Sequence, residues 1–206
     1  MHVIYCSLDP PDMQEGKLSI DPDSTALVII DLQVGIVGRE TEPHSAQSVV
    51  ENAVSLASKF KEMGMPVFFV HVSQKGSVPL SVISDATFAR PASMPENWSD
   101  FVPELGVTDS DLVITKRQWG AFYGTDLELQ LRRRKISTIV LCGIATSYGV
   151  ESTARFAYEY GFNQIFPEDA ITDMSEDAHR VSVEYILKRI GLVRSTREIL
   201  SALQGT

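Results

Sequence analysis

The sequence ALVIIDL, residues 26–32, decides the fold class of this chain. It is a nearly continuous run of apolar and β-branched residues, with no polar residue on either face of the predicted strand before Asp31. A strand that reads this way is buried on both faces, which is typical of a central strand in a parallel sheet covered by helices. The run therefore predicts a layered α/β domain with this strand in its middle.

The segments that follow alternate between helical and strand patterns. After a helix over 46–63, the sequence PVFFVHV at 66–72 predicts the second strand. Four more strands are expected at 112–115, 138–142, 164–166 and 192–194. Helices are expected at about 126–134, 149–160 and 175–190. The capping-box pair Ser195 and Glu198 predicts the start of a last helix. This alternation predicts a three-layer α/β/α sandwich with a six-stranded parallel sheet, in the Rossmann-like manner. Ligands of such sheets bind at the carboxyl ends of the strands.

The length of 206 residues fits one domain, which we place at 24–206 after an amino-terminal arm at 1–23. The arm is rich in Pro and Asp and lacks periodicity. The segment 73–110 contains four prolines and no long periodic stretch, so we expect an extended connection that can cover a pocket as a lid.

The charge and the cysteine content exclude several classes of protein. Acidic residues outnumber basic ones by 27 to 18, so a nucleic-acid partner is not expected. No apolar run approaches the roughly 20 residues that span a bilayer, and the first residues lack the pattern of a signal peptide. Cys6 and Cys142 are the only cysteines, which is not a disulfide framework and favours a reducing, cytoplasmic location.

Two charged residues follow predicted core strands. Asp31 ends the most apolar run of the chain, and Lys116 follows LVIT at 112–115. Burying either charge alone is costly, whereas each lowers the cost of burying the other. We therefore predict a catalytic pair, although Asp31 as a turn or cap former and Lys116 as an exposed lysine remain the plain alternatives.

The sequence GIATSYGVEST, residues 143–153, leaves a strand and enters a helix. Free backbone amides at such a helix start can hold an anion or a developing oxyanion. The sequence is neither the GxGxxG of dinucleotide binding nor a P-loop, so no nucleotide cofactor is expected.

Together these segments resemble the isochorismatase-like hydrolase family, which includes nicotinamidases and isochorismatases. VIIDLQ resembles the motif with the catalytic Asp, VITKRQWGAFYGTDL the motif with the catalytic Lys, and CGIATSYGVESTAR the motif with the nucleophilic Cys, over residues 24–200 in all. The resemblance implies that Asp31 and Lys116 are catalytic and that Gly149 occupies the position of the family's Cys. Cys142 precedes the turn and is read as a small core residue.

The glycine at this position changes the chemistry that the resemblance implies. Isochorismatases also have Gly there and hydrolyse a vinyl ether without a covalent intermediate, with Asp31 in the role of the acid. The alternative is a degenerate or Cys-to-Gly mutated thiol amidohydrolase that acts as a binding protein. The family also implies a cis peptide between Ala145 and Thr146 and a homodimer or higher homo-oligomer.

Further residues are expected around a small-molecule substrate. Those predicted to line the pocket are Gln33, His71, Trp119, Phe122, Tyr123 and Tyr148. The aromatic residues fit core or interface packing equally well, and a lone histidine is commonly structural. The other histidines are scattered at positions 2, 44 and 179, and no cluster like the nicotinamidase metal site follows His71, so no metal or other cofactor is expected.

Overall fold

A computed structural model describes residues 18–78, 80, 82–85 and 95–204 of the chain. Within them, parallel strands form a single sheet with the order β3-β2-β1-β4-β5-β7, and a short strand β6 pairs with β4. The strands are β1 (Thr25–Ile30), β2 (Val67–Val72), β3 (Leu112–Lys116), β4 (Thr138–Ile144), β5 (Asn163–Pro167), β6 (Ile171–Thr172) and β7 (Leu192–Arg194). The predicted six strands are all present, and β6 was not predicted because two residues carry no periodic signal.

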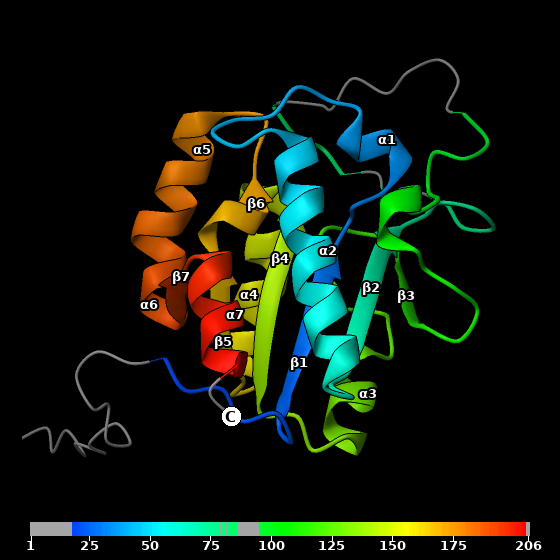
Figure 1. Cartoon of the computed structure of the whole chain (residues 1–206). Coiled ribbons are helices and arrows are strands. Elements are labelled where there is room, and N and C mark those ends of the chain that lie inside the picture. Colours follow the sequence, from blue (N-terminus) through cyan, green and yellow to red (C-terminus); the bar gives the residue numbers. More distant parts are fainter. Residues whose placement is uncertain (1–17, 79, 81, 86–94, 205–206) are drawn as a thin grey trace, which may run out of the picture.

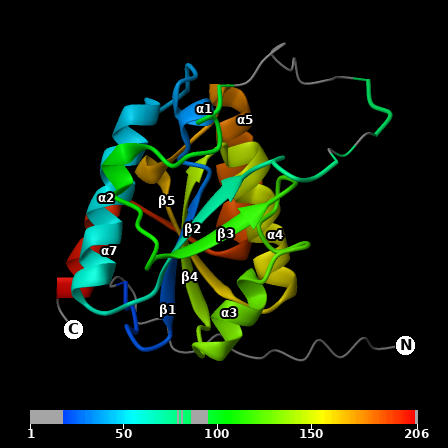
Figure 2. The ribbon, with the colours of Figure 1, turned by 90° about the vertical axis from the view of Figure 1, so that its right-hand side faces the viewer.

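Helices cover both faces of this sheet, so the predicted three-layer sandwich is confirmed (Figure 1). Helices α2 and α7 lie on one face, and α3, α4 and the α5 to α6 segment lie on the other (Figure 2). The helices are α1 (Val34–Val37), α2 (Ala46–Glu62), α3 (Leu127–Arg133), α4 (Glu151–Glu159), α5 (Glu176–Val181), α6 (Lys188–Ile190) and α7 (Thr196–Gln204). Single 3-10 turns are η1 (Pro103–Leu105) and η3 (Glu168–Ala170), and π-helical turns are η2 (Thr146–Val150) and η4 (Ser182–Leu187).

The core strand has the properties that its sequence predicts. All six residues of β1 are buried, because β2 and β4 flank it in the sheet and helices cover both faces. The capping box of α7 is also formed: Ser195 Oγ accepts from the Glu198 amide, and Glu198 Oε2 accepts from the Ser195 amide.

The order of the strands creates a switch point beside β1. The chain runs outward from β1 through β2 to β3, then returns to the other side of β1 as β4. Ligand sites of open α/β sheets lie at the carboxyl ends of the strands at such a point. The residues that follow β1 and β4, Asp31 and the turn of η2, meet there.

Two predicted segments are only partly described. The arm at 1–23 lies outside the described residues up to residue 17, and its later residue Ile20 is buried in the core. Of the segment 73–110, residues 79, 81 and 86–94 lie outside the described part. Its later portion is joined to the chain that follows β1, since the Val34 amide donates to Asp100 O and the Val102 amide donates to Leu32 O. No described helix has the length and apolarity needed to cross a membrane.

Candidate active site

Asp31 is the first residue after β1, and its backbone adopts an unusual conformation. Its amide donates to Val70 O, which continues the pairing with β2, but its φ of 54° lies in the left-handed region. Aspartate tolerates this region better than most residues, yet such outliers cost free energy and gather at functional sites. The side chain is thereby turned into the switch point and is almost fully buried.

Lys116 reaches the same place from the edge of the sheet. It is the last residue of β3, which is separated from β1 by β2, and its long side chain crosses the end of β2. Its Nζ lies 2.7 Å from Asp31 Oδ2 and also donates to the Trp119 carbonyl. The predicted Asp–Lys pair is therefore formed, and both partners are nearly inaccessible to solvent.

Burial has the largest effect on the pKa of the Asp31 carboxyl. The loss of solvent raises the pKa of the Asp31 carboxyl, and the Lys116 ammonium offsets this only in part, so that the pKa stays above its usual value. Within the described residues, Asp31 Oδ1 is buried without a hydrogen-bond partner, which agrees with a carboxylate that is poorly solvated. The sequence alone left open which of the two effects is larger.

Gly149 packs directly on this ion pair. A Cβ atom added at Gly149 would lie 3.1 Å from both Asp31 Oδ2 and Lys116 Nζ and 2.9 Å from Ile30 Cγ2. These separations are shorter than ordinary van der Waals contact, so a side chain at position 149 would press on the charged atoms and on Ile30. A glycine fits the ion pair in its observed geometry, and any larger residue would have to displace part of it.

The turn before Gly149 differs in detail from the prediction. The cis peptide lies between Ile144 and Ala145, one bond before the predicted Ala145–Thr146 bond. The motif does not mark which bond is cis, and β4 extends to Ile144, two residues beyond its predicted end.

Of the amides that were predicted to face an anion, that of Ser147 donates to Asp173 Oδ2 at 2.6 Å and that of Tyr148 donates to Ala145 O at 3.2 Å. Thr146 is fully buried, and its hydroxyl lies 2.9 Å from His179 Nδ1.

Gln33 and His71 lie beside Asp31 with their polar atoms engaged. The Gln33 amide group donates to Val72 O and Trp98 O and accepts from the Val72 amide, so it fastens the end of β2 to the chain after β1. His71 Nδ1 donates to Ser99 O at 2.6 Å, which leaves Nε2 to accept from the Thr115 hydroxyl at 2.8 Å. These bonds give both residues a positioning function.

The predicted aromatic residues occupy three different environments. Trp119 and Tyr148 lie edge to face with their ring centroids 5.0 Å apart, next to Lys116 and Gly149 in the chain. Phe122 is buried among the rings of Tyr160 and Phe162, which is the core packing that its sequence also allowed. Tyr123 is largely exposed.

A cavity in the described part of the chain lies beside His71 and does not include the ion pair. It measures about 630 Å³ and is lined by His71 and by residues of the connection between β2 and β3, among them Phe101 and Asp111. Asp31, Lys116 and Gly149 do not line it. The ion pair is the candidate active site, because there two buried charges meet at the switch point of the sheet.

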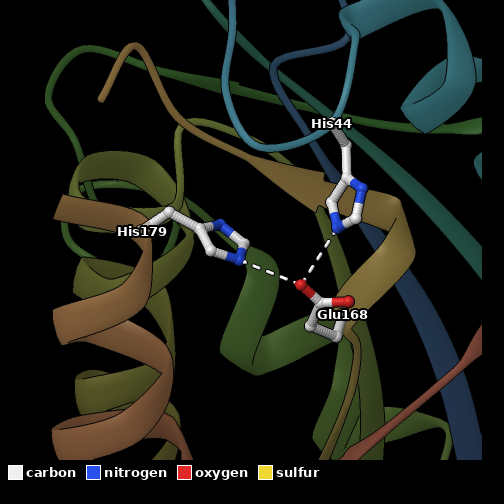
Figure 3. A group of neighbouring side chains, drawn as sticks. All are labelled: His44, Glu168 and His179. Carbon is white, nitrogen blue, oxygen red and sulfur yellow. Dashed lines mark hydrogen bonds and ion pairs between the residues drawn. The ribbon is translucent and has the colours of Figure 1, made fainter. Parts of the chain in front are cut away.

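Two histidines that look scattered in the sequence are brought together by the fold. His44 and His179 both contact Glu168 Oε1 through their Nε2 atoms, at 2.9 and 3.2 Å (Figure 3). The two residues lie 135 positions apart in the sequence, so their spacing does not indicate that they meet. No local motif marks the cluster, because its members come from three separate segments.

Known proteins share this fold and much of this sequence. The family model of the isochorismatase domain matches residues 25–198. The chain is 52% identical to the isochorismatase family protein YecD of Escherichia coli O157:H7, over 90% of this chain and 100% of that protein. It is 48% identical to the isochorismatase family protein YwoC of Bacillus subtilis, over 92% of this chain and 99% of that protein. The solved structure of an isochorismatase family protein from Burkholderia thailandensis superposes with a TM-score of 0.86 at 44% identity, over 92% of this chain and 100% of that one.

Proposed function

This chain belongs to the isochorismatase family and is a hydrolase, and from that premise we propose that it hydrolyses a small metabolite with Asp31 and Lys116 and without a cysteine nucleophile. The observation that carries the proposal is the contact between the buried Asp31–Lys116 pair and Gly149. A Cβ atom at this position would lie only 3.1 Å from both charged groups, so the pair is tightly packed where the family's thiol side chain would begin. Cys142 cannot replace it, because it lies inside β4 and burial raises the pKa of its thiol to about 12.

A carboxyl with a raised pKa suits acid catalysis on an enol ether. A protonated Asp31 would donate its proton to the carbon end of the C=C bond, which leaves an oxocarbenium ion at the ether carbon. The resulting carboxylate would then take a proton from the attacking water, and the hemiketal that forms would break down to a ketone and an alcohol. The bond that breaks is the C–O bond of the ether, and one water is consumed.

Lys116 would serve this cycle without exchanging a proton. Its ammonium lies 2.7 Å from Asp31 Oδ2 and would stabilise the carboxylate that exists between the two proton transfers. The bond from Nζ to the Trp119 carbonyl fixes the ammonium in place. The same bond ties the position of the Trp119 ring to the ion pair, so Trp119 and Tyr148 would form the wall against which a cyclic substrate packs.

The test compares four forms of the enzyme on isochorismate and on a panel of small amides. We expect the unmodified protein to hydrolyse the enol ether and Asp31→Ala to lose about 10²- to 10⁴-fold in kcat while remaining folded by circular dichroism. Gly149→Cys should lower the enol-ether rate without creating amidase activity, because its Cβ enters the space of the pair. Gly149→Ala is the matched control, since it adds the Cβ without the thiol.

The opposite outcomes identify the alternative. Amide turnover that starts only when Cys is installed would show that the chain is an inactive form of a thiol hydrolase. Saturable binding of isochorismate or of one of the amides without turnover would show a binding protein.

We also propose a homo-oligomer in a cytoplasmic setting. Exposed aromatic side chains lie on α4 and on the loop after β3, which is the composition of surfaces buried between subunits. The thiol of Cys142 is free, as is usual in a reducing compartment.

A further inference from the structure

His44, Glu168 and His179 form a compact group outside the Asp31–Lys116 site. His44 precedes α2, Glu168 opens the turn after β5, and His179 lies in α5, so three segments of the chain converge (Figure 3). One nitrogen or oxygen from each residue lies within 4.8 Å of the others. Both histidines point their Nε2 atoms at the same carboxylate oxygen.

We propose that this group binds a divalent transition-metal ion with the ligand preference of zinc, through His44 Nε2, His179 Nε2 and Glu168 Oε1. Two imidazoles and one carboxylate are a set that zinc accepts, with bonds of about 2.0–2.2 Å. Ligands around a tetrahedral ion at that range are separated by roughly 3.3–3.5 Å. The observed separations of 2.9 and 3.2 Å from Glu168 Oε1 are slightly shorter than this, and all three atoms lie within 4.8 Å of one another, so modest side-chain shifts would place them around one ion.

The surroundings of His179 match those of a metal ligand. Its other ring nitrogen, Nδ1, lies 2.9 Å from the hydroxyl of the buried Thr146. Histidine ligands usually donate from the second nitrogen to an oxygen nearby, which fixes the ring orientation. With Nε2 on the metal, Nδ1 would carry the hydrogen and donate to Thr146.

The negative charge of Glu168 and the access to the group from solvent also suit a metal ion. Glu168 supplies the anionic oxygen that a divalent ion prefers, and this oxygen already faces both imidazoles. A cavity of about 290 Å³ is lined by Glu168 and His179, and the side chains of Glu168 and His44 are partly exposed. An ion can therefore reach the group, and water from the cavity can supply its fourth ligand.

The ion would affect the active site by holding the turn η2 in position. Through Thr146 it would fix the turn η2, which carries Gly149 beneath the Asp31–Lys116 pair. It would also join the chain before α2 to α5. None of the three ligands contacts Asp31 or Lys116, so the ion would not take part in the proton transfer itself.

The experiment uses the full chain after removal of metal with a chelator, titrated with Co²⁺ and with Zn²⁺. We expect one ion per chain, visible Co²⁺ absorption bands of a low-coordinate site, and a higher melting temperature with Zn²⁺. Calorimetry should show that His44→Gln and Glu168→Gln each weaken Zn²⁺ binding by about 100-fold or more. Thr146→Val should weaken it by about 10- to 100-fold, as is usual for a residue that orients a ligand.

His71→Gln is the matched control, because His71 lies in β2 and its ring is bonded to Ser99 and Thr115. It should bind Zn²⁺ like the unmodified chain. The proposal is overturned if neither ion binds the unmodified chain with one-to-one saturation, or if His44→Gln and Glu168→Gln bind Zn²⁺ as tightly as the unmodified chain does.

Discussion

At the scale of the residue, the ionisation of Asp31 links stability to activity. Its burial and its unpartnered Oδ1 within the described residues make the charged form costly, and its left-handed backbone adds conformational strain. Lys116 compensates for only part of that cost. Such sites commonly reduce stability for the sake of function.

The raised pKa of Asp31 predicts the sign of a pH effect on stability. A carboxyl whose pKa is raised by folding adds stability at pH values below its unfolded pKa, and this contribution is lost as the pH rises through the folded pKa. Asp31→Asn should therefore match the unmodified protein at acidic pH and become the more stable of the two as the pH rises towards neutral. Urea unfolding of both proteins across that range measures the difference, and a variant that is less stable at neutral pH would contradict the raised pKa.

At the scale of the element, the closeness of β1 and β4 depends on one glycine. Gly143 is paired with Ile30 and has a φ of 123°. A Cβ added there would lie 2.0 Å from the Ile30 carbonyl oxygen, which belongs to the backbone and cannot rotate away. The strand pair that joins Asp31 to the turn of η2 therefore requires glycine.

We predict that Gly143→Ala lowers the free energy of unfolding by more than about 4 kcal/mol or prevents folding, because both the backbone conformation and the contact are incompatible with a side chain. Gly120→Ala is the matched control. Its nearest contacts would be ordinary ones at 3.6 Å, and a change of less than about 1 kcal/mol is expected. Chemical denaturation of both variants makes the comparison, and equal losses would show that the strand approach is not the cause.

At the scale of the whole molecule, one face carries several exposed aromatic side chains. This aromatic surface consists of Trp119, Tyr123, Phe156 and Tyr160, contributed by the loop after β3 and by α4. The rings of Phe156 and Tyr160 lie 6.3 Å apart, and Gly120 is close to Phe156. Because the Trp119 carbonyl accepts from Lys116, a second copy on this surface would stabilise the loop that holds the Lys116 ammonium.

We predict that the chain has at least twice the mass of one 22.8 kDa subunit in light scattering and that Phe156→Glu shifts it towards the monomer. A buried interface tolerates an unpaired charge poorly. Ser55→Glu adds the same charge on α2, at the opposite face of the sheet, and should leave the mass unchanged. A monomeric unmodified protein would refute the homo-oligomer, and a variant that remains associated would place the interface elsewhere.

Much of the fold was predictable because its signals are local. The apolar run before Asp31 and the helical periodicity of 46–63 gave a strand and a helix whose ends agree with the structure to within two residues. The pair of Asp31 and Lys116 was predictable as well, since the carboxyl ends of parallel strands share one edge of the sheet. The cis peptide was misplaced by one bond, and the core packing of Phe122 could not be told from a pocket position, because neither depends on the local pattern.

The sequence by itself determined the strand and helix order, the family, and the identity of the charged residues at the strand ends. Only the tertiary structure decided that burial has a larger effect than Lys116 on the pKa of Asp31. It also decided that Gly149 packs against the ion pair, and that His44 contacts Glu168, which lies 124 positions away in the chain. The reason is physical: periodicity and turn chemistry act over a few residues, whereas desolvation and ligand convergence depend on distances that only the packed chain sets.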